Sequence, residues 1–267
     1  MRPVLFQLGQ FPIRSYGLTM ALAFIVGIIV ARRRAKAAGI DPDTIIDLAF
    51  FVILASIAGA RALHVIVQWE FYRGDLLSIL RLWEGGLAQY GGIAVGVVTG
   101  ILFFVRRRID PWLGADTVAP SIALGVAIGR MGCFLNGCCY GKACDLPWAV
   151  TFRADSVAGH LIHDTPVHPT QLYESLASLI IFFVLLAVDR RKPYHGFLLW
   201  LFVLLLAAYR FVIDPVRYYD ATAMAVDGGR LALTTNQVMG VALIAISIAF
   251  MVFLGRRANP VDRPRQP

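Results

Sequence analysis

The chain has 267 residues, of which 58% are hydrophobic and only 16% are charged, and its mean hydropathy is +0.68. A water-soluble domain of this length does not need so much apolar surface, so the composition excludes an ordinary soluble protein. The net charge is +8. No nucleic-acid partner is needed to explain it, because the basic residues cluster at the ends of apolar segments.

Seven apolar segments recur along the chain, each close to the roughly 20 residues that a helix needs to cross a bilayer. In chain order they are residues 15–31, 44–67, 86–105, 117–135, 170–188, 196–213 and 235–254. The third is rich in glycine, so part of it is expected to be irregular. The fourth contains Pro120, which predicts a kink. We therefore expect an all-α integral membrane protein with seven transmembrane helices.

Basic residues predict how these helices are oriented. More than half of the 25 lysines and arginines form tight clusters after the first, third, fifth and seventh segments. Clusters at every second boundary mark the cytoplasmic side, so the N-terminus is expected outside and the C-terminus in the cytoplasm. The clusters also anchor the protein to the anionic inner leaflet.

A single transmembrane domain is expected over residues 1–257, with a small outward-facing cap at about 136–169. The polar, proline-rich tail at 258–267 is predicted to be disordered. A cleaved signal peptide is not predicted, because the basic cluster follows the first apolar segment instead of preceding it.

Three arginines lie inside the predicted spans, where a central arginine costs roughly 2.5–3.5 kcal/mol on insertion scales. Arg130 lies in the fourth span, Arg61 near the outer end of the second beside His64, and Arg210 near the outer end of the sixth. Arginine suits phosphate because its planar fork donates two hydrogen bonds and stays charged. We expect an anionic ligand at the outer leaflet. Two simpler alternatives remain open: Arg61 could pair with a carboxylate such as Asp214 or Glu174, and Arg210 could extend to the interface.

All four cysteines, Cys133, Cys138, Cys139 and Cys144, lie within 12 residues of one another. Their C-x4-CC-x4-C spacing differs from the common zinc pattern of paired C-x2–4-C units. Structural disulfides or packed thiols are therefore the favoured interpretation, with a metal site and a catalytic thiol–disulfide pair as alternatives. No metal and no cofactor are predicted.

Five motifs in order carry a family resemblance: IRSYGL (13–18), WEGGLAQYGG (83–92), GRMGCFLNGCCYG (129–141), HPTQLYE (168–174) and YRFVIDPVR (209–217). With them, the chain resembles the bacterial phosphatidylglycerol–prolipoprotein diacylglyceryl transferases along nearly its whole length. The resemblance implies transfer of a diacylglyceryl group from phosphatidylglycerol to the lipobox cysteine of a preprolipoprotein signal peptide. A thioether forms and glycerol phosphate leaves. It also implies a multi-pass protein of the bacterial cytoplasmic membrane, surrounded by membrane lipids, whose site faces the periplasm.

The resemblance assigns roles to individual residues. Arg130 is expected to hold the lipid phosphate, Arg210 the leaving group, and Tyr90 occupies the position of a proposed catalytic base. The expected substrate-binding residues are Tyr16, Arg61, Asn136, Gly141, His168, Glu174, Asp214, Arg217 and Gln237.

Departures from the family pattern leave the proton acceptor open. Many members have histidine where this chain has Tyr90, and a phenol with an ordinary pKa of about 10 is a poor base at neutral pH. Either nearby arginines suffice to ionise the substrate thiol, or His168 or Glu174 takes its proton. Cys133 and Cys138 replace an asparagine and a glutamate of the signature, and Asp214 replaces a glutamate.

Two other functions remain as alternatives to the transferase. The cluster at 133–144 could serve a membrane thiol–disulfide oxidoreductase, although it holds no C-x2-C pair. The arginines could instead belong to a non-catalytic phospholipid-binding paralogue.

Overall fold

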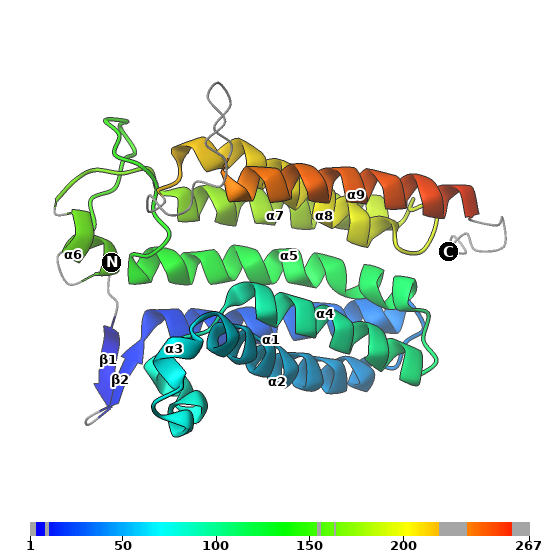
Figure 1. Cartoon of the computed structure of the whole chain (residues 1–267). Helices are drawn as coiled ribbons and strands as arrows, with labels where there is room; N and C mark the ends of the chain where they lie inside the picture. Colours follow the sequence, from blue (N-terminus) through cyan, green and yellow to red (C-terminus); the bar gives the residue numbers. More distant parts are fainter. Residues whose placement is uncertain (1–3, 9–10, 154–155, 163, 219–233, 258–267) are drawn as a thin grey trace. The chain divides into compact units, whose positions relative to one another are not determined.

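The computed structural model describes residues 4–8, 11–153, 156–162, 164–218 and 234–257 (Figure 1). Seven of its helices are long and apolar enough to cross a membrane. They are α1 (Ser15–Ala37), α2 (Pro42–Val67), α4 (Gln89–Arg106), α5 (Pro111–Asn136), α7 (Thr170–Asp189), α8 (Phe197–Ile213) and α9 (Thr235–Arg257). Large apolar side chains such as Phe50, Phe183 and Ile246 are exposed on them, as expected where lipid is the solvent. The all-helical, seven-span prediction is confirmed. The predicted tail at 258–267 lies outside the described residues.

Helix boundaries follow local chemistry more closely than hydropathy. Helix α1 continues through the basic cluster to Ala37, because lysine and arginine are good helix formers. Helix α2 begins at Pro42, where the Asp41 side chain caps it by accepting a hydrogen bond from the Asp43 amide. The third span begins as a helix only at Gln89, so the prediction of an irregular start is confirmed.

Shorter elements connect the long helices. They are β1 (Val4–Leu8), β2 (Phe11–Arg14), α3 (Trp69–Tyr72), η1 (Leu76–Leu80), η2 (Leu82–Glu84), α6 (Val157–Ile162) and η3 (Asp214–Val216). Strands β1 and β2 form an antiparallel hairpin before the first span, which was not predicted. The segment that contains α6 has a small hydrophobic core of Tyr140, Phe152, Ala158 and Val167.

The chain divides into two compact units. Unit 1 comprises Met1–Val30 and Ala115–Pro267, and unit 2 comprises Ala31–Gly114. In unit 1, buried residues of α5, α7 and α8 form the main core, which includes Ala119, Leu185, Leu198 and Phe202. Helices α7, α8 and α9 lie side by side (Figure 1).

Small residues bring α1 and α5 together in unit 1. A Cβ on Gly125 would lie 3.9 Å from the Ala23 carbonyl oxygen, one on Gly129 would lie 3.8 Å from the Met20 Cε, and one on Gly132 would collide with Thr19. Close approach through glycine is a common way for membrane helices to pack. It places the start of α1 beside the end of α5.

Glycines have the same use in unit 2, where α2 packs against α4. A Cβ on Gly91 would lie 2.5 Å from the Cβ of Leu63, and one on Gly92 would lie 3.1 Å from the Ser56 carbonyl oxygen. Gly96 faces Ser56 in the same way. Gly91 and Gly92, which flank Tyr90, serve helix packing as well.

Candidate active site

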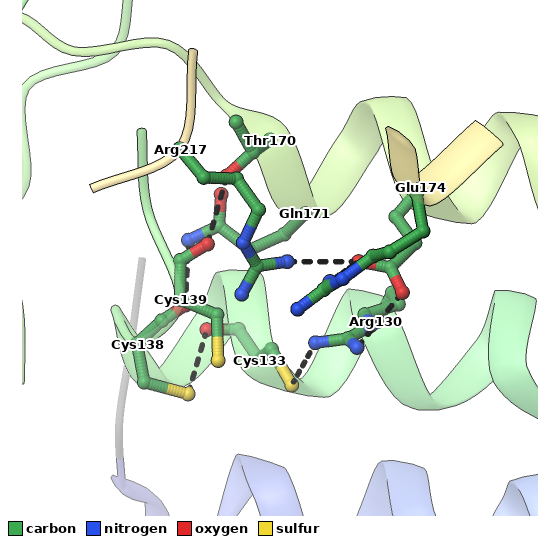
Figure 2. A network of polar contacts seen from close by, with 9 residues as sticks. Arg130, Cys133, Cys138, Cys139, Thr170, Gln171, Glu174 and Arg217 are labelled. Atoms are coloured by element: carbon green, nitrogen blue, oxygen red, sulfur yellow. Dashed lines mark hydrogen bonds and ion pairs between the residues drawn. The ribbon is translucent and has the colours of Figure 1, made fainter. Parts of the chain in front are cut away.

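Three arginines converge on one buried carboxylate in unit 1. Arg130 binds Glu174 with an N–O distance of 2.8 Å and Arg217 binds it at 3.1 Å (Figure 2). Arg210 binds it at 3.5 Å. Both Glu174 oxygens are engaged, since Arg130 contacts Oε1 and the other two contact Oε2. Three guanidinium groups against one carboxylate leave an excess of positive charge inside the membrane-spanning bundle. Such a group is suited to hold an anion.

The three arginines differ in how much of each side chain is exposed. Arg130 is 19% exposed, Arg210 is 27% exposed and Arg217 is 8% exposed, while Glu174 is 5% exposed. Arg130 and Arg210 can therefore reach a ligand while they keep their bonds to Glu174. Arg217 lies deeper and contributes charge and support.

Short local motifs place these side chains. Arg130 and Cys133 are three residues apart on α5, and Gln171 and Glu174 are three apart on α7, so each pair shares a helix face. Arg210 lies in the last turn of α8, where a cation is favoured by the helix dipole. Pro215 follows in the short turn η3, after which the chain returns Arg217 to Glu174.

The end of α5 folds back on itself through a left-handed glycine. Gly137 has φ +74°. Its amide donates to the Phe134 carbonyl at 3.2 Å, and the Cys138 amide donates to the Cys133 carbonyl at 3.1 Å. These two hydrogen bonds form a Schellman motif, in which the chain after the helix end folds back on the last helical turn. The C-x4-C spacing thus brings Cys138 next to Cys133.

Cys139 completes a cluster of three thiols with Cys133 and Cys138. Its backbone is left-handed, with φ +62°, and the three sulfur atoms all lie within 4.8 Å of one another. Cys133 Sγ lies 4.0 Å from Arg130 Nη1 (Figure 2). Hydrogen bonds from the Cys133 and Cys138 thiols, and then the nearby Arg130 and Arg217, lower the pKa of the Cys139 thiol below its usual value. All four cysteines, including Cys144, are free thiols.

The first residues of α7 clamp this turn. Thr170 Oγ1 donates to the Cys139 carbonyl at 2.8 Å, and Gln171 Nε2 donates to the Cys138 carbonyl at 2.7 Å (Figure 2). Thr170 and Gln171 are not among the predicted site residues, although both lie in the HPTQLYE motif. Both side chains are buried. Buried polar side chains need hydrogen-bond partners, and these two find them in the carbonyl groups of the turn.

Gly141 lies where three chain segments meet. Its amide donates to the His168 carbonyl at 3.0 Å, and it pairs with Arg217 in an isolated β-bridge. A Cβ at this position would lie 2.6 Å from both the His168 Cβ and the Val216 carbonyl oxygen. Gly141 and His168 therefore align backbone around the site, and the His168 ring packs edge-on against Tyr173.

Replacing Gly141 with alanine is expected to destabilise the protein by about 1–3 kcal/mol, the usual cost of overpacking. The added methyl group must push apart the segments that carry His168 and Val216. Thermal unfolding in detergent measures the effect. Gly74→Ala is the control, because nothing lies within 4 Å of a Cβ there. Equal unfolding temperatures for the two variants would count against this packing.

Asp214 in η3 and Gln237 in α9 both bind Thr234, which directly precedes α9. Asp214 is buried and accepts a hydrogen bond from Thr234 Oγ1 at 2.5 Å. The Gln237 side chain accepts a hydrogen bond from the backbone amide of Thr234 at 3.1 Å. The backbone amide of Gln237 in turn donates to Thr234 Oγ1 at 3.1 Å. This reciprocal pair is a capping box. The T-x-x-Q spacing in the sequence signals it, and it was missed.

Tyr16 and Asn136 lie beside the thiol cluster. Tyr16 is close enough to interact electrostatically with Arg130 and with the three thiols, and Asn136 makes a side-chain hydrogen bond with Cys138. The predicted site residues that gather around Arg130 and the turn that follows it include Tyr16, Asn136, Glu174, Arg210 and Arg217.

Arg61 and Tyr90 belong to unit 2, where backbone carbonyl groups surround Arg61. It is buried, and its guanidinium donates to five carbonyl groups, at Ser78, Ile79, Arg81, Gly85 and Gly86, over distances of 2.5–3.3 Å. All five N–H donors of an arginine are thereby used. Of the carboxylates considered for Arg61, Glu174 instead pairs with the other arginines, and Asp214 accepts a hydrogen bond from Thr234. Arg61 holds the loop before Tyr90 in shape, and Tyr90 itself is exposed.

Replacing Arg61 with lysine is expected to loosen this loop. A lysine has three donors and cannot span the five carbonyls. Amide hydrogen exchange over residues 76–88 should become at least about 10-fold faster, which corresponds to about 1.4 kcal/mol. Arg107→Lys, at an exposed ion pair with Asp47 in the same unit, is the matched control. Unchanged exchange in the Arg61 variant would contradict the anchoring role.

These features define an integral membrane protein with a buried arginine–carboxylate cluster at the meeting point of α5, α7 and α8 in unit 1. Residues 3–253 match the family model described as prolipoprotein diacylglyceryl transferase. The chain belongs to this family.

Relatives are similar over most of their length. A protein of Thermosynechococcus vestitus is 38% identical over 213 residues, covering 79% of this chain and 80% of its own. One of Finegoldia magna is 34% identical over 253 residues, covering 94% and 95%. One of Listeria monocytogenes is 32% identical over 260 residues, covering 97% and 91%. Each carries the name phosphatidylglycerol–prolipoprotein diacylglyceryl transferase. This membership favours a transferase over the thiol–disulfide oxidoreductase and the non-catalytic paralogue.

Proposed function

We propose that this protein transfers the diacylglyceryl group of phosphatidylglycerol to the lipobox cysteine thiol of a preprolipoprotein. A thioether forms and glycerol phosphate is released. The observation that carries the proposal is the set of three arginines on Glu174, two of which remain partly exposed, in a chain that belongs to the prolipoprotein diacylglyceryl transferase family.

The charges suit the chemistry of this reaction. The substrate phosphate is a singly charged diester, and the leaving glycerol phosphate gains negative charge as the carbon–oxygen bond breaks. Fixed cationic donors stabilise such developing charge. Arg130 holds the lipid phosphate and Arg210 holds the leaving group. Glu174 and Arg217 position them, because Glu174 binds all three arginines.

The remaining predicted site residues have supporting or substrate-contacting roles. Tyr16 and Asn136 line the site beside Arg130. Gly141, His168, Asp214 and Gln237 act through the backbone and the hydrogen bonds that hold the arginines in place. Arg61 shapes the loop that precedes Tyr90. Tyr90 is the candidate catalytic residue of unit 2.

The site is proposed to face the outer leaflet of the bacterial cytoplasmic membrane. The end of α5, the start of α7 and the end of α8 alternate with the basic clusters along the chain, so the positive-inside rule assigns them to the outer side. The N-terminus is then outside. Residues 1–257 form a single transmembrane domain, and the segment at about 136–169 is its outward cap.

Complementation tests the proposal in cells. The chain is expressed in bacteria depleted of their own transferase, and incorporation of labelled palmitate into a lipoprotein is measured. We expect labelling with the wild-type chain and none when Arg130 is replaced by glutamine. A stably inserted wild-type chain that yields no labelled lipoprotein would overturn the proposal.

A further inference from the structure

The three clustered cysteines have no role in the site as described so far. Cys133, Cys138 and Cys139 are free thiols, and their sulfur atoms all lie within 4.8 Å of one another. They point toward one another below Arg217 and beside Arg130 (Figure 2). Sulfur ligands of tetrahedral zinc at about 2.3 Å from the metal lie roughly 3.8 Å apart. A small contraction of the cluster is enough to reach that geometry.

The backbone holds the three thiols in place. Cys138 is returned to Cys133 by the left-handed Gly137, and Thr170 and Gln171 fix the carbonyls of the two later cysteines. Cys139 adopts φ +62°, a region that residues other than glycine, asparagine and aspartate rarely occupy. Packing alone does not call for a cysteine there, because glycine adopts this conformation without cost. The left-handed backbone directs the Cys139 side chain to the other two thiols.

We propose that Cys133, Cys138 and Cys139 bind a zinc ion through three thiolates, with a fourth coordination position that accepts the thiol of the protein substrate. Among the described residues, no histidine, aspartate, glutamate or further cysteine joins this group. Three protein ligands with one open position are typical of catalytic zinc, whereas structural sites have four. Cys139 is exposed, so the open position can be reached.

Charge and position connect this zinc site to Arg130. Three thiolates and one Zn²⁺ carry a net negative charge, and the nearest guanidinium nitrogen of Arg130 lies 4.0 Å from Cys133 Sγ. The excess positive charge of the three arginines is thus partly balanced, while Arg130 still faces the place where a phosphate binds. The Arg130 guanidinium thus connects the thiol cluster to Glu174.

The chemical role of the zinc rests on the proposed transferase function. On binding to zinc, the substrate thiol releases its proton to water. The sulfur then attacks the glyceryl carbon that carries the phosphate ester. The carbon–sulfur bond forms, the carbon–oxygen bond breaks, and its electron pair leaves with glycerol phosphate, which Arg130 and Arg210 hold. The neutral thioether dissociates from the metal, and no group is oxidised or reduced. This supplies the ionised thiol without a histidine at position 90.

Metal content and cobalt spectroscopy test the site on the full-length protein. Purified under reducing conditions, the protein should contain about one zinc per chain. After exchange with Co²⁺, it should show sulfur-to-cobalt charge-transfer bands and the visible bands of a tetrahedral site. A lipobox peptide with its cysteine should shift the visible bands, and the same peptide with serine should not. Failure of the reduced protein to bind either metal overturns the proposal, as does a disulfide within the cluster of the isolated protein. A Co²⁺ spectrum that does not respond to the cysteine peptide contradicts the claim that the fourth coordination position accepts the substrate thiol.

Variants separate this inference from the proposed function. Cys133→Ser should lose at least about 10-fold in zinc affinity, whereas Cys144→Ser, outside the cluster, should keep its zinc. Arg130→Gln should keep its zinc and its cobalt spectrum while transfer is lost. If transfer occurs in protein free of zinc, the inference fails and the proposed function stands. If zinc binds but wild-type protein shows no transfer, the proposed function fails and the metal site stands.

Discussion

Replacing Arg130 with glutamine is expected to slow diacylglyceryl transfer by at least about 100-fold, because removal of one preorganised donor to a developing negative charge typically has that effect. Arg130 is held at 2.8 Å by Glu174 and remains 19% exposed, so it is aimed before the lipid arrives. Glutamine keeps a hydrogen-bond donor but loses the charge and the two-pronged fork. Arg130→Lys keeps the charge alone and should recover only part of the rate.

The rate is measured with the purified variants in vesicles that contain phosphatidylglycerol. Arg73→Gln is the control, because Arg73 is 65% exposed and pairs only with the exposed Glu70 among the ion pairs described. Thermal unfolding in detergent establishes that each variant is folded. A folded Arg130→Gln protein with the activity of the Arg73 control would remove Arg130 from the reaction.

Replacing Glu174 with glutamine is expected to lower the free energy of unfolding by about 3–5 kcal/mol, because removal of one partner from a buried ion pair leaves charge uncompensated. Here one carboxylate serves Arg130, Arg210 and Arg217, and the Glu174 side chain is only 5% exposed. The neutral amide leaves three guanidinium groups close together, and they should move apart. Transfer should fall with the loss of their alignment.

Thermal or denaturant unfolding in detergent measures this effect against Glu70→Gln. Glu70 forms an exposed ion pair with Arg73, and such pairs contribute only about 0–1 kcal/mol. The two substitutions are chemically identical, so the difference reports burial and the number of partners. If Glu174→Gln unfolds with the same free energy as Glu70→Gln, the buried cluster does not stabilise the fold as described.

The spans could be predicted from sequence because bilayer thickness fixes their length and hydropathy marks them. Their ends could not, since charged residues such as Lys36 continue a helix beyond the lipid and proline can begin one, as Pro42 does. The hairpin before α1 was missed, because two short strands have a weak signal next to seven long apolar segments.

Arg130, Arg210 and Glu174 could be selected from sequence, the arginines because charge is costly in a span. What they contact could not. Their meeting on Glu174 depends on how α5, α7 and α8 pack, and a one-dimensional pattern does not contain that distance. Arg61 is the opposite case. It also lies in a span, but its guanidinium donates its hydrogen bonds to backbone carbonyl groups of the loop that follows the helix.

Only part of the geometry of the cysteine cluster could be predicted from the sequence. The Schellman turn could have been anticipated from Gly137 after a helix end, and it explains the C-x4-C spacing. The left-handed conformation of Cys139 could not, because cysteine has no preference for it.

The most direct test of the central claim uses purified protein in vesicles of phosphatidylglycerol with a lipobox peptide. Mass spectrometry of the peptide and an assay of released glycerol phosphate are run on the same samples. We predict a peptide heavier by one diacylglyceryl group on its cysteine and an equal amount of glycerol phosphate, with neither product when that cysteine is serine. A folded protein that yields no modified peptide, or a modified peptide without glycerol phosphate, would contradict the account.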